Sequence, residues 1–156
     1  MAVLTSKKVY WGARILLGFI FISAGTMKIT DLESFSKVIE AFAIVPSGWC
    51  DFFAVMICAG EIISGVGLVA DLKGSLGAVL SMLVAFIAVL SYAVFMGYDI
   101  DCGCFGPDDP EAVVFAGLKG SLVRDAAMVV QVLYLYLWRY KNNHFPLSFD
   151  FYKNRR

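Results

Sequence analysis

Hydrophobic positions in this chain gather into four long runs that are separated by shorter polar stretches. The third run, Ser75–Tyr98, has 24 consecutive residues without a charge. It also lacks the polar stripe of a helix at the surface of a soluble protein. About 20 apolar residues in a helix cross the roughly 30 Å hydrocarbon core of a bilayer. The pattern therefore predicts four transmembrane helices, at Tyr10–Ile29, Asp51–Ala70, Ser75–Tyr98 and Gly120–Trp138.

The composition agrees with this pattern, because 60% of the residues are hydrophobic and the mean hydropathy is +0.75. Soluble domains are about 45–50% apolar. Backbone groups in lipid must be satisfied internally, so spans are helical. We expect an all-α membrane protein in which residues 1–138 form a four-transmembrane-helix bundle and residues 139–156 a polar tail. The first run, about 19 residues, is longer than the apolar region of a signal peptide, so we expect a retained helix.

The connections between the runs differ in length. Asp71–Gly74 predicts a tight turn between the second and third spans, whereas 30–50 and 99–119 are expected to be longer loops. Small residues in the first two spans favour close helix packing. These are Gly12, Gly18, Ala24, Gly25, Gly60, Gly65 and Gly67.

Basic residues predict the orientation of the bundle, because cytoplasmic loops carry an excess of Lys and Arg. Nine lie on the side of the termini: Lys7, Lys8, Arg14, Lys73, Arg139, Lys141, Lys153, Arg155 and Arg156. Four lie on the opposite side: Lys28, Lys37, Lys119 and Arg124. We expect a multi-pass protein of the inner (cytoplasmic) membrane with both termini cytoplasmic. The net charge is zero and there is no basic stripe, which argues against nucleic-acid binding.

The most distinctive motif is Asp101-Cys102-Gly103-Cys104-Phe105-Gly106-Pro107, in the expected extracytoplasmic loop between the third and fourth spans. Thiols in an oxidising compartment tend to pair. Cys102 and Cys104 can pair only in a small ring, for which Gly103 supplies the backbone freedom. A strained disulfide is more easily reduced, which favours a redox-active pair. A structural disulfide and a soft-metal site are the alternatives. The first gains little from so short a loop, and the second lacks a nearby histidine.

Two further cysteines lie in the second span. Cys50 begins this span on the outer side and is a candidate to exchange with the loop pair. Cys58 lies about 12 Å deeper, which is too far for a disulfide with Cys50 in a regular helix. A buried cysteine also acts as a small hydrophobic residue, so packing is the alternative for Cys58.

Charged residues inside the spans need partners or a function. Glu61 lies near the midplane and is an ion-pair partner of Arg14, a proton acceptor or a contact for a quinone ring. Lys28 and Arg124 lie near the outer ends of their spans. They either extend to the interface or favour the thiolate form of a nearby cysteine by lowering its pKa.

Three sets of residues form a recognisable pattern. The first span contains Arg14, Leu17-Gly18, Phe21, Ala24-Gly25 and Lys28, and the second contains Glu61, Gly65 and Leu68. With these residues the chain resembles the DoxX-like membrane proteins, and residues 101–106 with Arg124-Asp125 resemble the MauE branch of that family. Asp125 departs from the asparagine expected there. The resemblance implies a four-helix bundle linked to redox maturation of exported proteins, often beside a thioredoxin-like partner.

The leading hypothesis is a membrane-embedded thiol–disulfide oxidoreductase. It would exchange electrons between an extracytoplasmic thioredoxin-like or folding protein and a membrane quinone. The expected catalytic residues are Cys102, Cys104, Cys50 and Glu61. The expected quinone-contacting residues are Arg14, Lys28, Cys58, Glu61 and Arg124. Two alternatives remain: a transporter or carrier of a soft metal or sulfur species, and a non-catalytic assembly factor.

Overall fold

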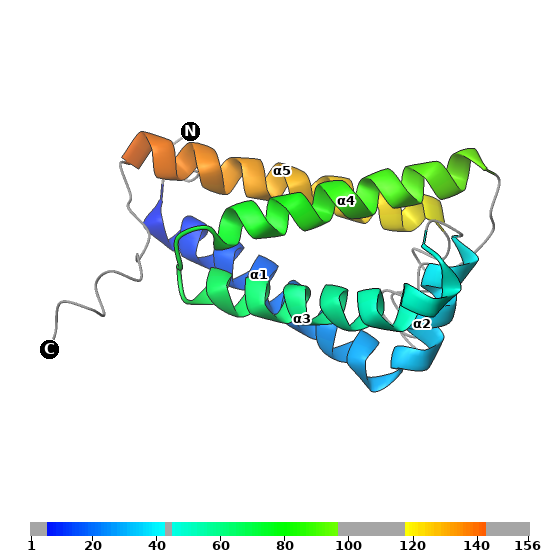
Figure 1. Ribbon diagram of the computed structural model, residues 1–156. Helices are drawn as coiled ribbons and strands as arrows, with labels where there is room; N and C mark the ends of the chain where they lie inside the picture. The colour runs from blue at the N-terminus through cyan, green and yellow to red at the C-terminus, as the bar shows by residue number, and fades with distance from the viewer. Residues whose placement is uncertain (1–5, 43–44, 97–117, 143–156) are drawn as a thin grey trace, which may run out of the picture.

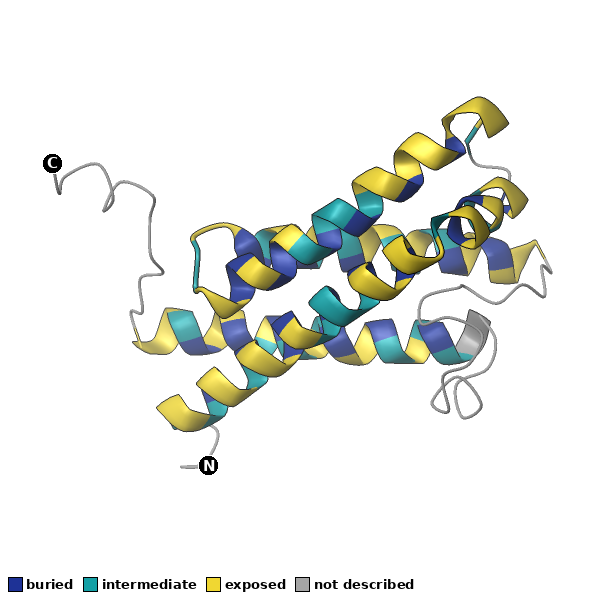
Figure 2. Ribbon diagram, turned by 90° about the horizontal axis from the view of Figure 1, so that it is seen from below, coloured by how far each residue is buried: buried dark blue, intermediate teal, exposed yellow. Residues whose placement is uncertain are grey.

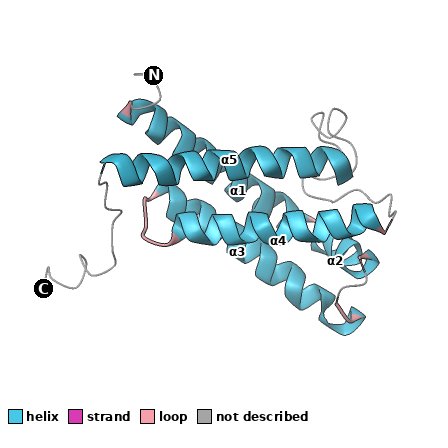
Figure 3. Cartoon of the chain, turned by 90° about the horizontal axis from the view of Figure 1, so that it is seen from above, coloured by secondary structure: helices cyan, strands magenta, loops and turns pink. Residues whose placement is uncertain are grey.

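Four long antiparallel helices dominate the computed structural model, which describes residues 6–42, 45–96 and 118–142 (Figure 1). They are α1 (Lys7–Thr30), α3 (Cys50–Val69), α4 (Ser75–Phe95) and α5 (Leu118–Asn142). The start of α1 and the end of α5 lie at one end of the bundle, together with the turn between α3 and α4 (Figure 3). The opposite end carries a short helix, α2 (Leu32–Ala41), and a single 3-10 turn, η2 (Ser47–Trp49).

The four long helices are each long and apolar enough to cross a membrane, which confirms the predicted four-span, all-helical architecture. No more than 39% of the residues of any span are buried in the protein. Large apolar side chains such as Phe19, Ile63 and Leu137 are exposed. Exposed positions recur along each of the four long helices (Figure 2). In water this surface would be an aggregation hazard, whereas in a bilayer it is the lipid contact. The predicted Cys-x-Cys loop lies outside the described residues.

The main core lies between all four long helices. Tyr10 and Leu17 of α1 pack there with Val79 of α4 and Val132 of α5, all of them fully buried. The Tyr10 and Trp138 rings stack with centroids 4.1 Å apart, which joins α1 to α5 near the end where the chain enters and leaves the bundle.

Helices α1 and α3 approach each other closely along a line of glycines. A Cβ atom added at Gly65 would lie 2.8 Å from the Gly18 carbonyl oxygen. One added at Gly25 would lie 3.0 Å from the Cys58 carbonyl oxygen. Any side chain at these positions would push the helices apart, so the predicted close packing is confirmed there. It is wrong for Gly12, which has no atom within 4 Å of its added Cβ.

The connection expected as a loop after the first span contains α2. Asp31 caps this helix by accepting a hydrogen bond from the Ser34 amide, 3.2 Å away, and hydrogen bonds from Ser34 lower the Asp31 pKa. Phe35 packs on Ala54 and Cys58 of α3, while Phe42 packs on Leu90 and Ala93 of α4. The apolar side of α2 therefore covers one end of the bundle. The sequence predicts a loop here because the apolar residues of this segment are too few to span a membrane.

The tight turn between α3 and α4 is confirmed. Asp71 has a φ of 58° and Gly74 a φ of 95°, so two residues adopt the left-handed conformation. Glycine takes it freely, and aspartate is among the few other residues that tolerate it. The turn fixes the Asp71 carboxylate at the end of the bundle, where it meets α1 and α5.

Candidate functional site

A buried ion pair joins α1 to the middle of α3. Lys28, in the last turn of α1, donates a hydrogen bond from Nζ to Glu61 Oε1, and the two residues are only 3% and 2% exposed. The Lys28 ammonium also lies 5.2 Å from the centre of the Phe35 ring and 5.0 Å from that of Phe86. These aromatic faces add a cation–π attraction to the ion pair. Lys28 therefore points into the bundle and does not extend to the interface.

A small cavity lies beside this ion pair. Its volume is about 20 Å³, and a water molecule needs about 10–15 Å³ of such space. Lys28 and Glu61 line it together with Arg124 and Asp125 of α5, and the remaining wall is apolar, with Phe21 of α1 and Phe86 of α4 among its members. Three helices thus bring two cations and two carboxylates to one small space in the bundle.

The two carboxylates of this cavity are both deeply buried. Asp125 is 2% exposed, and its Oδ1 accepts hydrogen bonds from Nε and Nη2 of Arg124 at 3.3 and 3.2 Å. Glu61 Oε1 is occupied by Lys28, but Glu61 Oε2 has no hydrogen-bond partner in the structure. An unpaired buried carboxylate oxygen is unfavourable, so the site favours a water molecule or a proton at Oε2.

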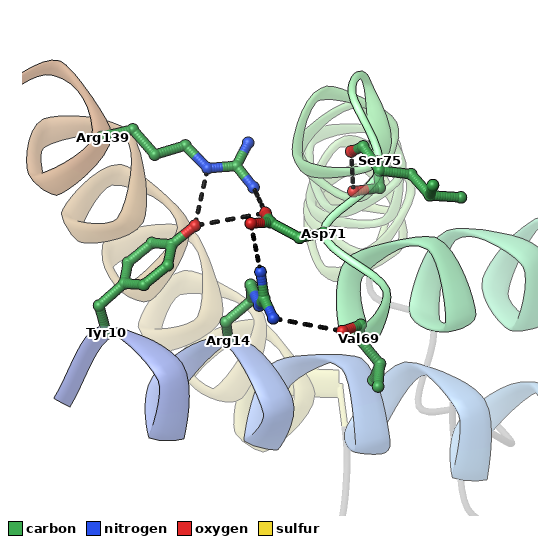
Figure 4. Close-up of polar contacts among 7 residues, drawn as sticks. Tyr10, Arg14, Val69, Asp71, Ser75 and Arg139 are labelled. Atoms are coloured by element: carbon green, nitrogen blue, oxygen red, sulfur yellow. Dashed lines mark hydrogen bonds and ion pairs between the residues drawn. The ribbon is translucent and has the colours of Figure 1, made fainter. Parts of the chain in front are cut away.

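Arg14 does not pair with Glu61, so that expectation was wrong. Arg14 Nη1 lies 2.6 Å from Oδ2 of Asp71, and Nη2 donates to the Val69 carbonyl oxygen at 3.3 Å (Figure 4). Arg139 of α5 shares the same Asp71 carboxylate and donates from Nε to the Tyr10 hydroxyl at 2.9 Å. Arg14 and Lys28 are 14 residues apart, about 21 Å along one helix, so they occupy separate clusters.

The described cysteines are both free thiols and both buried. Cys58 of α3 is fully buried in the cluster that contains Phe35 of α2. Cys50 is 2% exposed, and its thiol donates weakly to the Pro46 carbonyl oxygen at 3.7 Å. Within the described ranges, no group of three His, Cys, Asp or Glu residues could hold a metal ion. Cys102 and Cys104 lie outside these ranges.

The structure thus gathers three predicted site residues, Lys28, Glu61 and Arg124, around one cavity and places Arg14 elsewhere. Sequence reasoning gave no role to Asp71 or Tyr10, which complete the Arg14 cluster. One signal could have identified Asp71. An arginine inside a span needs a counter-charge, and Asp71 is a carboxylate in the turn next to a neighbouring span. Asp125 was expected near the entrance of the fourth span and noted as a departure from the family's asparagine. A charged residue inside a predicted span is the signal that could have indicated a buried role.

Fold and site together define a multi-pass membrane protein: a four-helix bundle with a small ionic cavity in its apolar interior. The chain belongs to the MauE family, because the family model described as methylamine utilisation protein MauE matches residues 6–139. A methylamine utilization protein MauE from Paracoccus denitrificans is 32% identical over 105 residues, which is 65% of this chain. The chain spans 56% of the length of that curated relative. No solved structure matches.

Proposed function

We propose that this protein is a membrane thiol–disulfide oxidoreductase whose Cys102/Cys104 pair acts on an extracytoplasmic redox partner. The observation that carries the proposal is the Cys102-Gly103-Cys104 motif, which lies inside the region matched by the family model. In the sequence this motif lies between α4 and α5; the end of α4 and the start of α5 are both at the end of the bundle that α2 covers. The partner expected there is a thioredoxin-like or folding protein.

The printed name of the Paracoccus relative supplies the proposed biological setting. That protein is named for methylamine utilization, and we propose that this chain serves the same process. A membrane protein with paired outer thiols fits the redox maturation of an exported protein of that process. The proposal assigns the chain no direct reaction with methylamine.

The proposed exchange conserves electrons between two cysteine pairs. The thiolate of Cys102 attacks a disulfide sulfur of the partner, which forms a mixed disulfide and releases one partner thiolate. Cys104 then attacks the mixed disulfide at the Cys102 sulfur. The partner leaves with two thiols, and Cys102 and Cys104 are left as a disulfide. The reverse sequence oxidises the partner, and the redox state of the pair in the membrane decides the direction.

Each cycle requires a second redox agent to reset the pair, and a quinone dissolved in the lipid is our candidate. The cavity beside Glu61 does not fit a quinone ring, because its volume of about 20 Å³ is that of a water site. We therefore route no step through a quinone at Glu61, Arg14 or Lys28. The alternative function, transport of a soft metal, is less favoured. Cys50 and Cys58 would have to act together in it, but each is buried in its own place.

The test is the redox state of the thiols in native membranes. Acid-trapped samples are alkylated, reduced and labelled with a second mass tag, with a soluble quinone added in one arm and a dithiol in the other. We expect Cys102 and Cys104 to change between free and paired states, and Cys50 and Cys58 to stay free. A Cys102→Ser/Cys104→Ser variant should lose partner exchange and keep its fold, whereas Cys58→Ala should keep both.

Two outcomes would contradict the proposal. If the pair stays oxidised under both additions, the disulfide is structural and the protein acts as a non-catalytic assembly factor. If the thiols stay free and a soft metal protects them from alkylation, the protein is a metal carrier. Full activity of the double serine variant would also rule out exchange by this pair.

A further inference from the structure

The cavity between α1, α3, α4 and α5 contains an unexplained polar atom. The Glu61 side chain is 3% exposed, Oε1 accepts from Lys28, and Oε2 has no hydrogen-bond partner. A structural ion pair buried in an apolar bundle is favourable only when its remaining lone pairs are satisfied. Glu61 instead lines a cavity whose walls carry Arg124 and Asp125.

We propose that this cavity is a hydrated proton-binding site, in which one water donates a hydrogen bond to Glu61 Oε2 and Glu61 takes up the proton. The volume of about 20 Å³ suits a single water. A buried water makes two to four hydrogen bonds, and the charged groups of α1 and α5 that line the cavity supply the other partners. This inference does not depend on the proposed thiol exchange.

The charges around Glu61 balance before proton uptake. Of the described residues that line the cavity, Lys28 and Arg124 are cations and Glu61 and Asp125 are carboxylates, so the charges of these four sum to zero. Protonation of Glu61 leaves one positive charge, and release restores neutrality. Among the described residues that line the cavity, α4 contributes only Leu83 and Phe86, and α2 faces Lys28 with Phe35. Within the described ranges, counter-charges therefore reach Glu61 from α1 and α5.

Two features suit the cluster to reversible protonation. The Phe35 and Phe86 rings hold the Lys28 ammonium through their faces, so Lys28 keeps a favourable site when Glu61 is neutral. The Arg124 side chain is 24% exposed, whereas that of Asp125 is 3% exposed. Glu61 thus shares a cavity with Arg124, whose side chain is partly exposed, and we expect the proton to reach Glu61 from this side.

The experiment is an infrared pH titration of the full chain in lipid nanodiscs, with ¹³C-labelled glutamate carboxyl groups. We expect a protonated-carboxyl band that appears on acidification, is lost in Glu61→Gln and is retained in Glu33→Gln, an exposed carboxylate control. A titration without a Glu61-dependent band across the pH range of the folded protein would overturn the proposal. If Glu61→Gln does not fold, the double variant Lys28→Met/Glu61→Gln serves as the reference without a Glu61 carboxyl. It removes both charges of the ion pair, so no buried cation is left without its counter-charge.

The water is tested by filling the cavity without changing a charge. Ala24→Val adds two methyl groups to a residue of the cavity wall, and Ala88→Val adds the same volume on an exposed face of α4. We expect Ala24→Val to change the proton affinity of the Glu61 band at least tenfold and to remove an isolated water O–H band. Ala88→Val should leave both unchanged. An unaltered titration in a folded Ala24→Val protein would contradict a water-filled site.

Discussion

Two buried ionic clusters define this protein at the scale of single residues. In the first, Arg14 and Arg139 share the carboxylate of Asp71, and the Tyr10 hydroxyl accepts a hydrogen bond from Arg139 (Figure 4). In the second, Lys28 pairs with Glu61 beside a polar cavity. The first cluster joins α1, the α3–α4 turn and α5. Both clusters contain a buried atom without a hydrogen-bond partner, Arg14 Nε in the first and Glu61 Oε2 in the second. Only Glu61 lines the cavity described above, so the second cluster is the candidate for chemistry.

Asp71→Asn is expected to lower the free energy of unfolding by about 3–5 kcal/mol, because it leaves the 2%-exposed Arg14 without a counter-charge. Asparagine still tolerates the left-handed backbone of this turn, so the change tests the charge alone. The measurement is unfolding in mixed micelles. The matched control is Glu33→Gln, which removes an exposed partner of Lys37 and should change stability by less than about 1 kcal/mol. If Asp71→Asn lowers the free energy of unfolding no more than Glu33→Gln does, the Asp71 network contributes little to stability.

At the scale of elements, the closest contact is the glycine line between α1 and α3. Gly18, Gly25 and Gly65 let the two backbones approach until an added Cβ would lie within 3.0 Å of a backbone oxygen of the neighbouring helix. This approach aligns the end of α1 with the middle of α3. It thereby places Lys28 within reach of Glu61, so the packing of small residues positions the ionic cavity.

Gly65→Ala should destabilise the α1–α3 pair by about 1–3 kcal/mol, because its Cβ would lie 2.8 Å from the Gly18 carbonyl oxygen. Gly12→Ala is the control, since nothing lies within 4 Å of its added Cβ. Its effect should stay within about 1 kcal/mol and favour the helix. Unfolding in mixed micelles compares the two. A neutral Gly65→Ala would mean that the helices are farther apart than described.

Phe35→Ala should expose the Cys58 thiol. Phe35 is the buried residue of α2 in the cluster that contains Cys58, and Leu32 and Ile39 of α2 pack beside it. Truncation of a buried phenylalanine costs about 3–5 kcal/mol in packing. The rate of Cys58 alkylation by a polar maleimide, read by peptide mass, should rise. Phe95→Ala removes an 88%-exposed ring and should leave the rate unchanged. An unreactive Cys58 in Phe35→Ala would show that α2 is not its cover.

At the scale of the whole molecule, most residues of each span are not buried in the protein, and many of the exposed ones are large and apolar. Figure 2 shows that exposed positions run along all four long helices. Its helices alternate in direction, so the start of α1 and the end of α5 share one end. The short helix α2 and the ionic cavity belong to the other half. The proposed proton site therefore lies in the same half of the bundle as the end of α4 and the start of α5.

Reporter fusions should place both ends of the chain in the cytoplasm. The basic residues on that side outnumber those on the other side by nine to four, which predicts this orientation. A cytoplasm-active reporter joined before Lys7 or after Asn142 should be active, and one inserted within α2 should be inactive. As a control, an export-dependent reporter at the same three positions should show the opposite pattern. Reporters on opposite sides would contradict an even number of spans.

The sequence by itself determined the number of spans, the tight turn after α3 and the family. An apolar run of about twenty residues forms a helix in lipid, because the backbone must satisfy its own hydrogen bonds there. A motif such as Cys102-Gly103-Cys104 can be recognised from consecutive residues alone. Tertiary structure alone decided which charges meet. Arg14 was expected beside Glu61, but the glycine contacts set how α1 and α3 align, and this alignment gives Glu61 to Lys28 and Arg14 to Asp71. Such pairs depend on how each helix is rotated and how deep it lies relative to its neighbours. Hydropathy does not contain this information, because it records only whether each segment prefers lipid or water.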